Sequence, residues 1–388
     1  MIQNIEKIFE KKFGKAFVKV QSPGRINLIG EHTDYNDGFV LPASINLGTS
    51  FVCAPNDINK FRFYSYNLNE MYETPVDKLG KSKTVWANYL IGVIAQFVKD
   101  GKEVHGFDCV FGGDIPMGAG LSSSASIETG LAYAINQMEE FDYPLFDLVR
   151  FSQKAEHEYA DVQCGIMDQF AVMYGKSNQV IKLDCRSLDH EYHTFEQKDQ
   201  MLILVNSGVK HNLEDSKYNI RRQECESGVE LLQKHNESIQ ALRDVTIDMI
   251  EAYQKEFDPV IYKRCRYVVE ENMRVEAACK AMDRNDFNTF GQQMYASHEG
   301  LKNDYEVSCA ELDQLVDLAQ SVDGVLGARM MGGGFGGCTI NLVKKAAIEA
   351  FEKKILENYK TPQGESPDII KVTIDGGTRP VLIKPVHG

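Results

Sequence analysis

Residues 23–38 hold a dense group of side chains that could act on a small polar molecule. Arg25, Glu31, His32 and Asp34 lie within ten positions of one another, in a segment interrupted by glycines. Carboxylates accept hydrogen bonds from sugar or alcohol hydroxyls, and an arginine pairs with phosphate or carboxylate groups. Taken alone, such a segment would be interpreted as a solvated charged loop, so its meaning depends on the rest of the chain.

A second segment, residues 116–126, is rich in glycine and serine. It reads Pro-Met-Gly-Ala-Gly-Leu-Ser-Ser-Ser-Ala-Ser, between an expected strand and an expected helix. Glycines let the backbone approach a ligand closely, and the free N–H groups and positive dipole end at a helix start favour an anion. The alternative is an ordinary serine-capped helix after a glycine turn. The segment is not a Walker A loop, because no lysine closes it.

A third segment, residues 332–337, has glycine at five of its six positions. It matches the pattern GxGxxG, but a dinucleotide site would need a helix after it, and residues 338–343 are typical of a strand. A protein-kinase loop would need later HRD and DFG elements, which are absent. A simple hairpin is the alternative. So many glycines cost entropy on folding, which favours a backbone surface that approaches a ligand or another loop.

The elements that must position these segments alternate irregularly between strand and helix. The first strand is expected to end at Ser22-Pro23-Gly24. A strand-rich first half and a helix-rich second half predict an α+β chain of two lobes, residues 1–200 and 201–388. Strands are expected at 17–21, 49–54, 60–66, 107–111, 201–206, 328–331 and 338–343, helices at 86–98, 123–138 and 144–159, and mostly helix over 219–318.

Composition limits the classes of function. The chain has 388 residues, 43% hydrophobic and 25% charged, as in an ordinary globular protein. Its formal net charge of −14 argues against nucleic-acid binding, because neutralising phosphates needs clustered lysine and arginine. No window approaches 18 uncharged apolar residues, so no membrane span is expected. The nine cysteines are scattered and no apolar signal core begins the chain, so we expect free thiols and a cytoplasmic location.

These three segments, in this order, closely resemble those of the galactokinases, members of the family named for galactokinase, homoserine kinase, mevalonate kinase and phosphomevalonate kinase. The resemblance is most specific in residues 24–35, Gly-Arg-Ile-Asn-Leu-Ile-Gly-Glu-His-Thr-Asp-Tyr. Residues 164–170, Cys-Gly-Ile-Met-Asp-Gln-Phe, resemble the segment that carries the catalytic aspartate, and the match covers essentially the whole chain. It implies a two-lobed α+β kinase fold with the site in the cleft, a left-handed βαβ unit in the N-terminal lobe and a helix-rich C-terminal lobe.

The resemblance also implies a role for individual residues. Asp168 and Arg25 would be the catalytic pair, with Asp168 against the anomeric hydroxyl as a base or an electrostatic partner. Mg²⁺ would be bound by Ser124 and Glu156, with Ser123 as a competing hydroxyl ligand, and Trp86 would lie near the adenine. The sugar would be held by Glu31, His32, Thr33, Asp34, Gly165, Asp168 and Tyr218, and the ATP phosphates by Gly118, Ala119, Gly120, Leu121, Ser122, Ser123 and Ser124.

The implied reaction is ATP-dependent phosphorylation of the C1 hydroxyl of D-galactose, the first step of galactose catabolism, by a monomeric enzyme. Phosphoryl transfer asks mainly for positioning and charge neutralisation, so Cys164 is expected to pack as a small hydrophobe and not to act as a nucleophile. Two alternatives stay open. In the first alternative, the enzyme phosphorylates N-acetylgalactosamine or arabinose instead of galactose. In the second, the chain is a non-catalytic sugar-and-ATP sensor. The intact serine run, Arg25 and Asp168 weigh against a sensor.

Overall fold

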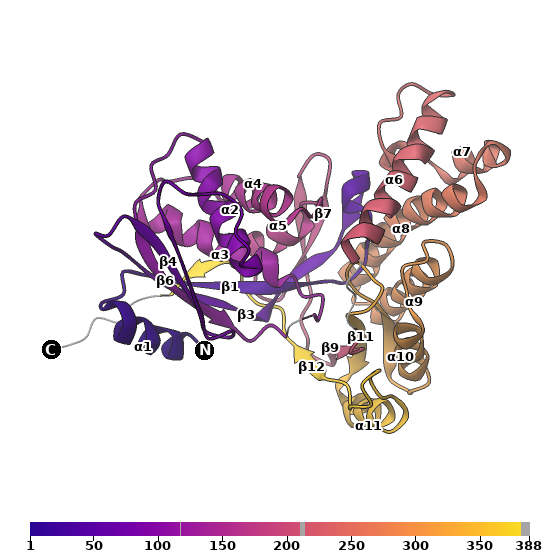
Figure 1. Cartoon of the computed structure of the whole chain (residues 1–388). Helices are drawn as coiled ribbons and strands as arrows, with labels where there is room; N and C mark the ends of the chain where they lie inside the picture. The colour runs from indigo at the N-terminus through magenta and orange to yellow at the C-terminus, as the bar shows by residue number, and fades with distance from the viewer. Residues whose placement is uncertain (117, 210–213, 382–388) are drawn as a thin grey trace.

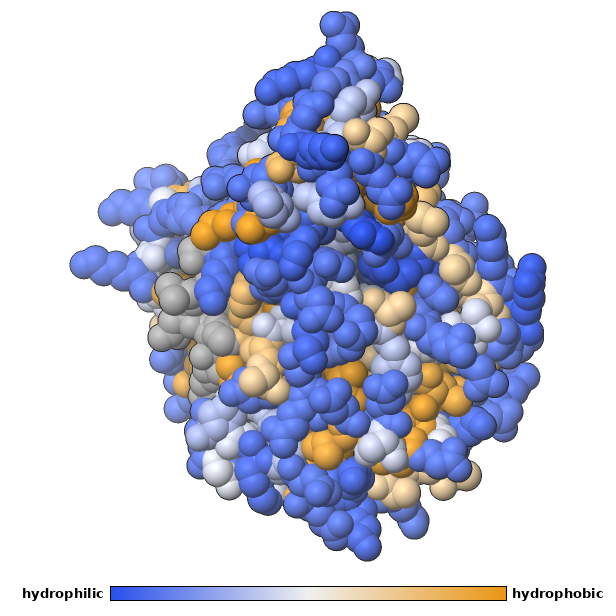
Figure 2. Space-filling view, turned by 90° about the vertical axis from the view of Figure 1, so that its right-hand side faces the viewer, coloured by the Kyte–Doolittle hydropathy of each residue, from blue (hydrophilic) through white to orange (hydrophobic). Residues whose placement is uncertain are grey.

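A computed structural model describes residues 1–116, 118–209 and 214–381 of the chain (Figure 1). Two lobes lie side by side, the first running from indigo to magenta and the second from rose to yellow. Among the described helices, none is long and apolar enough to cross a lipid bilayer. The face of the second lobe seen in Figure 2 is mostly hydrophilic with a few hydrophobic patches, in keeping with the acidic composition.

The first lobe is built on a six-stranded sheet. Helix α1 lies on one side of this sheet and helices α2 to α5 lie on the other (Figure 1). In order across the sheet, the strands are β13 (Arg379–Pro380), β1 (Val18–Asn27), β3 (Pro42–Pro55), β6 (Phe107–Gly113), β4 (Lys60–Ser65) and β5 (Glu70–Pro75). The helices are α1 (Ile2–Phe13), α2 (Val85–Lys99), α3 (Ser123–Met138), α4 (Leu145–Ala155) and α5 (Met167–Tyr174).

The alternation of side chains along β3 explains why the sheet has a hydrophobic core on each of its two faces. Phe51 and Cys53 face the large core beneath α2 to α4, while Val52 between them faces the small core beneath α1. Successive side chains of a strand point to opposite faces, so one strand supplies both cores. Pairing is antiparallel throughout this sheet except between β4 and β6, which are parallel and have α2 between them in the chain.

A second, three-stranded sheet lies next to the predicted sugar segment. It consists of β2 (Phe39–Val40), β7 (Gln179–Asp184) and β8 (His190–Thr194), and the short turn η1 (Asp34–Asn36) precedes it. Because β2 pairs with β7, the segment that follows the charged loop is tied into the first lobe.

The second lobe packs helices around an antiparallel four-stranded sheet. Its strands, in order, are β10 (Val325–Met330), β11 (Cys338–Lys344), β9 (Gln200–Asn206) and β12 (Ile369–Val372). The helices are α6 (Glu214–Gln233), α7 (Ile247–Ala252), α8 (Pro259–Asp283), α9 (Phe287–Asn303), α10 (Ala310–Gln320) and α11 (Ile348–Asn358), with 3₁₀ turns at η3 (Leu242–Asp244), η4 (Gln254–Glu256) and η5 (Lys345–Ala347).

The predicted division after residue 200 falls at the first residue of β9. The chain crosses back once after it, because β13 pairs with β1 at Gln21 and Val20. The last described residues therefore lie in the first lobe, although they follow the helix-rich half in sequence.

One local prediction was wrong, and a second was right in its bounds but not in the type of helix. The first strand does not end at Ser22-Pro23-Gly24 but continues to Asn27, because a register shift between Pro23 and Arg25 absorbs the proline within the pairing with β3. The helix expected over 144–159 stops at Ala155 and widens into one turn of π-helix, η2 (Glu156–Ala160). Such wider turns often occur at functional sites. The helix at 123–138 is confirmed with the same bounds.

Candidate active site

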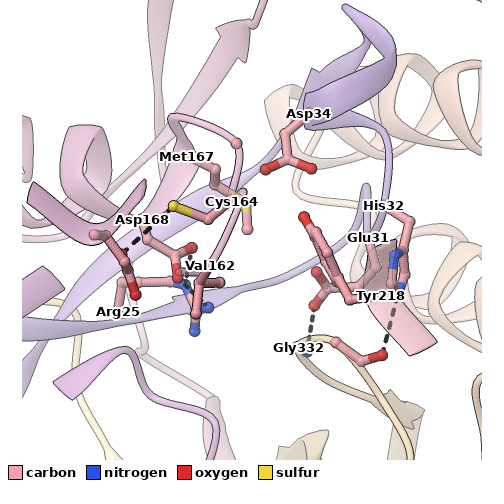
Figure 3. Close-up of a pocket in the computed structure, with 13 residues that line it drawn as sticks. Arg25, Glu31, His32, Asp34, Val162, Cys164, Met167, Asp168, Tyr218 and Gly332 are labelled. Atoms are coloured by element: carbon pink, nitrogen blue, oxygen red, sulfur yellow. Dashed lines mark hydrogen bonds and ion pairs between the residues drawn. The ribbon is translucent and has the colours of Figure 1, made fainter. Parts of the chain in front are cut away.

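A cavity of about 230 Å³ lies between the charged segment, the aspartate segment and the glycine-rich run (Figure 3). It adjoins a second space of about 220 Å³ along the serine-rich loop, and Arg25 lines both. Every residue predicted for the ATP phosphates, from Gly118 to Ser124, lines that second space. The first cavity is lined by Arg25, Glu31, His32, Asp34, Glu156, Val162, Cys164, Gly165, Met167, Asp168, Tyr218, Gly332 and Gly333.

Arg25 and Asp168 form a two-point ion pair at the junction of the two spaces. Arg25 Nε donates to Asp168 Oδ1 at 2.7 Å and Arg25 Nη2 donates to Asp168 Oδ2 at 2.8 Å. Arg25 follows the bulge in β1, and Asp168 lies in the first turn of α5. Arg25 Nη1 also donates to the carbonyl of Gly120 at 2.6 Å, which ties the guanidinium to the serine-rich loop.

The serine that begins α3 has an unusual role. Ser122 is the N-cap residue and has a left-handed backbone, with φ of 54°. A capping serine normally accepts a hydrogen bond from the first turn of its helix. Here no side chain caps α3, and the Ser122 hydroxyl donates to Asp168 Oδ2 instead. The N–H groups at the start of α3 therefore have no capping side chain as acceptor, an arrangement that would suit an anion.

Ser124 and Glu156 are brought together by the π-helical turn. Ser124 Oγ donates to Glu156 Oε1 at 2.8 Å, and the Glu156 carboxyl is buried. Burial raises the pKa of Glu156 to about 6, helped by the nearby charge of Asp168. A hydroxyl and a carboxylate in contact offer two hard oxygen ligands, which suit Mg²⁺. Of the described residues, none form a cluster of three or more acidic, histidine or cysteine ligands.

Sequence reasoning missed the groups behind Glu156. Gln169 Nε2 donates to Glu156 Oε2 at 2.6 Å and lies 3.4 Å from Glu128 Oε2. Burial, and then the charge of Glu156, raise the pKa of Glu128 well above its usual range. Gln169 lies within the aspartate segment, but a glutamine gives no sign of its partner in sequence. Glu128 lies among apolar residues of α3, which is the signal that could have identified it.

Cys164 lies in the cavity wall beside the same carboxyl. Its Sγ is 3.5 Å from Glu156 Oε2, and burial raises the pKa of the thiol well above its usual range. The thiol therefore remains protonated, and the prediction that Cys164 is no nucleophile agrees with its surroundings.

Glu31 connects the charged loop to the second lobe. Its Oε1 accepts from Arg329 Nη2 at 2.9 Å and from the backbone N–H of Gly332 at 2.8 Å, while Oε2 accepts from Asn27 at 3.0 Å. Arg329 is fully buried and also donates to the carbonyls of Asn27 and Leu28. Arg329 was not singled out from sequence, although an arginine inside an apolar strand was a usable signal.

His32 lies in the cavity wall with both ring nitrogens engaged. Nδ1 is 2.7 Å from the Tyr35 hydroxyl. Nε2 is 3.2 Å from the carbonyl of Gly333 (Figure 3). Burial lowers the pKa of His32 to about 3, so the ring is neutral near pH 7. Its ring centroid is 5.4 Å from that of Tyr218, which comes from α6.

Asp34 points toward the cavity beside Gly165 (Figure 3). Burial, and then the charge of Asp168, raise the pKa of Asp34 to about 7. A Cβ on Gly165 would lie 1.8 Å from Asp34 Oδ2, so no larger residue fits there without moving the carboxylate. This contact explains the glycine in the aspartate segment.

Thr33, predicted to contact the sugar, does not line the cavity. Its side chain is buried, and its Oγ lies 2.6 Å from the carbonyl of Phe39 and 2.9 Å from that of Gly30. The hydroxyl therefore bonds to the backbone of its own loop and does not reach the cavity.

Part of the glycine-rich run lines the space along the serine-rich loop. Gly332, Gly334 and Gly337 all have positive φ. A Cβ on Gly334 would lie 2.2 Å from the carbonyl of Val307. Gly332 and Gly333 line both the first cavity and the space along the serine-rich loop. The prediction that this backbone approaches a ligand or another loop is consistent with that position.

Trp86 lines a larger adjoining pocket of about 510 Å³, together with Tyr89, Phe111 and Ile127. Ser123 and Ser124 line it too, so it opens onto the start of α3. The Trp86 indole donates to Glu70 at 2.8 Å, and its ring lies 5.6 Å from that of Phe111. An apolar, aromatic pocket beside a phosphate loop suits a flat base.

Comparisons with known proteins bear on this arrangement. The model described as galactokinase galactose-binding signature matches residues 7–55, that of the GHMP kinases N terminal domain matches 88–176, and that of the GHMP kinases C terminal matches 278–361. A galactokinase of Clostridium beijerinckii is 41% identical over 98% of this chain and all of its own length. A galactokinase of Enterococcus faecalis is 44% identical over 92% of this chain and 94% of its own.

Solved structures agree. The crystal structure of Lactococcus lactis galactokinase complexed with galactose superposes with a TM-score of 0.93 at 36% identity, covering 98% of this chain and 99% of the other. Mevalonate kinase of Methanococcus jannaschii, at 17% identity, has a TM-score of 0.67 over 93% of this chain and 99% of the other, and supports the fold alone. Fold and site together define a small-molecule kinase of the GHMP class. Within that class, the chain belongs to the galactokinase family.

Proposed function

We propose that this enzyme transfers the γ-phosphoryl group of ATP to the C1 hydroxyl of D-galactose, giving galactose 1-phosphate and ADP. The observation that carries the proposal is the Arg25–Asp168 pair, which stands between a polar cavity and a phosphate-type loop. An acceptor hydroxyl in the first space and a phosphoryl group in the second would meet at this pair. Phosphoryl transfer needs this placement and neutralisation of charge.

Asp168 would contact the acceptor hydroxyl through the one hydrogen-bond acceptor position of its carboxylate that is still free. A carboxylate has about four acceptor positions, and three donors already occupy them: two from Arg25 and one from Ser122. Two of the three bind Oδ2, so the open position is on Oδ1. We propose that Oδ1 receives the hydrogen bond of the C1 hydroxyl, and that Arg25 balances negative charge as the phosphoryl group arrives.

The other sugar hydroxyls would be held by Glu31, His32 and Asp34, with Gly165 and Tyr218 in the wall. The free lone pairs of Glu31 Oε2 and the carboxylate of Asp34 accept hydroxyl hydrogens, and neutral His32 completes the polar side. Buried groups with fixed partners favour one sugar, because a sugar that leaves them unpaired loses their hydrogen bonds.

ATP would lie across the second space with its base against Trp86. The uncapped start of α3 and the glycine backbone on both sides support phosphate binding through N–H groups. Ser124 Oγ and Glu156 Oε1 would hold Mg²⁺, with the phosphates and water supplying further oxygens, and the ion would neutralise phosphate charge.

We further propose a monomer that acts in the cytoplasm. All nine cysteines are unpaired, which supports a reducing compartment. Light scattering of the purified protein tests the first point.

A substrate panel tests the proposed reaction. ADP release with Mg-ATP is measured for galactose, N-acetylgalactosamine, arabinose and mevalonate, with a sugar-free reaction as control. We expect the highest kcat/KM with galactose. A higher kcat/KM with another acceptor would replace galactose as the substrate. Binding of galactose without turnover of any acceptor would identify a sensor and refute the proposal.

A further inference from the structure

A chain of hydrogen bonds runs behind His32, away from the reacting groups. His32 Nδ1 lies 2.7 Å from the Tyr35 hydroxyl, and this hydroxyl lies 2.7 Å from that of Tyr305. Cys225 Sγ lies 3.3 Å from the same Tyr305 oxygen. Tyr305 and Cys225 are buried, so the far end of the chain is shielded from water. The sugar loop, the segment after α9 and helix α6 are joined in this way.

One carbonyl fixes the direction of every bond in this chain. His32 Nε2 faces the carbonyl of Gly333, which can only accept, so Nε2 carries a hydrogen. The ring is neutral because burial lowers the pKa of His32 to about 3, so Nδ1 has no hydrogen and can only accept. Tyr35 must therefore donate to Nδ1. Its oxygen then accepts from Tyr305, whose own oxygen accepts from Cys225.

The donors in the chain keep their hydrogens at ordinary pH. Burial raises the pKa of Tyr35 and Tyr305 well above the usual tyrosine value, and raises that of Cys225 to about 12. Each group therefore has one hydrogen to give, and the chain has a single polarity from Cys225 to Gly333.

We propose that Tyr35 and Tyr305 are positioning residues that hold His32 as the Nε2–H tautomer, so that the cavity meets a histidine that only donates. The Nε2 to Gly333 distance of 3.2 Å is at the long end for an N–H···O bond, so we propose that an acceptor oxygen of a bound sugar shares this hydrogen with the Gly333 carbonyl. The inference rests on the proposed function for its consequence, sugar recognition, but not for the tautomer itself.

The second wall of the cavity is linked to the same chain. Tyr218 and Cys225 are seven residues apart on α6, which is two helical turns, so they lie on the same side of the helix. The rings of Tyr35 and Tyr218 are 5.0 Å apart. Helix α6 therefore carries both a cavity-lining ring and the first donor of the chain.

Nuclear magnetic resonance of the ligand-free protein tests the tautomer directly. Long-range ¹H–¹⁵N correlation spectra at pH 7 distinguish the two neutral forms from imidazolium, and the His32→Gln variant identifies the His32 signals. We expect the Nε2–H form alone in the wild-type protein. An Nδ1–H form or a charged ring would overturn the proposal without any variant being needed.

Two variants test which residues hold the ring. Tyr35→Phe removes the donor to Nδ1 and leaves only the long contact with the Gly333 carbonyl to favour the Nε2–H form, so a minor Nδ1–H population should appear. Tyr305→Phe leaves that donor in place but frees its oxygen, so a smaller change is expected. An unchanged Nε2–H signal in Tyr35→Phe overturns the proposal, and an unchanged signal in Tyr305→Phe removes Tyr305 from it.

Tyr267→Phe is the matched control. Tyr267 is buried, its ring is 4.7 Å from that of Tyr305, and its hydroxyl donates to the Glu31 carbonyl at 3.0 Å, outside the chain. The His32 tautomer should be unchanged in this variant. A change equal to that of Tyr35→Phe would show a general packing effect and refute the assignment.

Kinetics give a second readout that a merely structural role would not produce. Losing the fixed donor should raise the galactose KM about threefold to tenfold in Tyr35→Phe, as for one hydrogen bond, with kcat and the KM for ATP within about twofold. An equal rise in both KM values would contradict a local role. If no sugar is phosphorylated at all, the spectra still decide the tautomer. Failure of the proposed function can therefore be told apart from failure of the tautomer proposal.

Discussion

The loop at residues 30–38 and the loop at residues 116–124 lie at adjoining parts of the candidate active site. They differ in the contacts that hold them and in how exposed their residues are. The first is held by side chains: Glu271 accepts from the Gly30 N–H at 2.8 Å, and Asn36 donates to the His32 carbonyl at 2.9 Å. Glu31, His32 and Thr33 are all buried. In the second, Gly118, Gly120 and Ser123 are exposed, and buried Ala119 and Leu121 anchor the loop between them.

This difference matches what each loop is proposed to bind. A sugar is recognised by the direction of each hydroxyl, so its site benefits from polar side chains that cannot turn. A triphosphate is recognised by charge, which backbone N–H groups and a helix start supply whatever the side chains are. The comparison predicts that side-chain changes in the first loop alter sugar binding strongly, and that most changes in the second alter ATP binding weakly.

The largest effect is expected where the two loops meet, from Asp168→Asn. The amide keeps the shape of Asp168 but loses the charge that pairs with Arg25, so kcat should fall about 10³-fold or more. The dissociation constant for galactose should change less than about fivefold. ADP release at saturating substrates and calorimetric titration of galactose separate the two quantities. A near-normal kcat would rule out the assigned role of Asp168.

Asp108→Asn is the control for this variant. Arg62 and Asp108 form a similar two-point pair on the first sheet, with distances of 2.6 and 2.7 Å, away from the cavity. The control should lower the melting temperature but leave kcat within about twofold. A comparable loss of kcat in both variants would mean that Asp168 acts through stability.

The second largest effect is expected from Glu156→Gln. The amide removes a charged oxygen from the proposed ion site beside Ser124, so kcat should fall about 10²-fold and the Mg²⁺ concentration for half-maximal rate should rise. Initial rates across a Mg²⁺ series measure both. Glu158→Gln, which loses an exposed pair with Lys99, serves as the control. An unchanged Mg²⁺ requirement would remove Glu156 from the site.

The same residue shows where sequence reasoning succeeds and where it stops. The spacing of apolar residues predicts the helix before Glu156, because local patterns reflect local structure. Without the resemblance, Glu156 would be interpreted as a solvent-facing side chain. It is buried because the helix widens at this point, and because Ser124 and Gln169, both distant in sequence, donate to it.

Arg329 and Tyr305 show the same limit of sequence reasoning for the residues that are proposed to bind the sugar. Residues 24–35 identify the loop and its polar groups from sequence, because the motif is contiguous. Nothing local shows that Glu31 is held by Arg329, or that His32 leads through Tyr35 to Tyr305, about 270 residues further along the chain. Contacts of this kind arise from the packing of the second lobe against the first, which no periodicity encodes.

A smaller effect, confined to sugar binding, is expected when a change of pH alters the ionisation of Asp34. Its pKa is raised to about 7, so the carboxylate that accepts sugar hydroxyls becomes more populated as pH rises from 6 to 8. The galactose KM should fall about threefold to tenfold over this range, while the KM for ATP changes at most about twofold, because Glu156, with a pKa of about 6, is at least half ionised throughout. Steady-state kinetics across pH check this. An equal change in the two KM values would contradict the division between the loops.

Asp34→Asn should remove this dependence and raise the galactose KM at all pH values. Its effect on stability has the opposite sign. A carboxyl whose folded-state pKa is raised stabilises the fold below its unfolded value, and that contribution is lost as pH rises through about 7. Without sugar, the melting temperature of the variant should therefore rise relative to that of the wild-type protein between pH 5 and pH 8, by the equivalent of about 2.5 kcal/mol. No relative change over this range would show that Asp34 is already ionised at pH 5 in the empty cavity.

The smallest effect is expected from Ser123→Ala. The Ser123 side chain is exposed, whereas Ser124 Oγ contacts Glu156, so removing the Ser123 hydroxyl leaves both the backbone donors and the proposed ion ligand in place. The KM for ATP and kcat should stay within about twofold of wild type, while Ser124→Ala should lower kcat about tenfold and raise the Mg²⁺ requirement. Parallel Mg²⁺ titrations of the two variants decide between the serines. The reverse order would make Ser123 the hydroxyl ligand, and the loop would then depend on an exposed side chain as well as on its backbone.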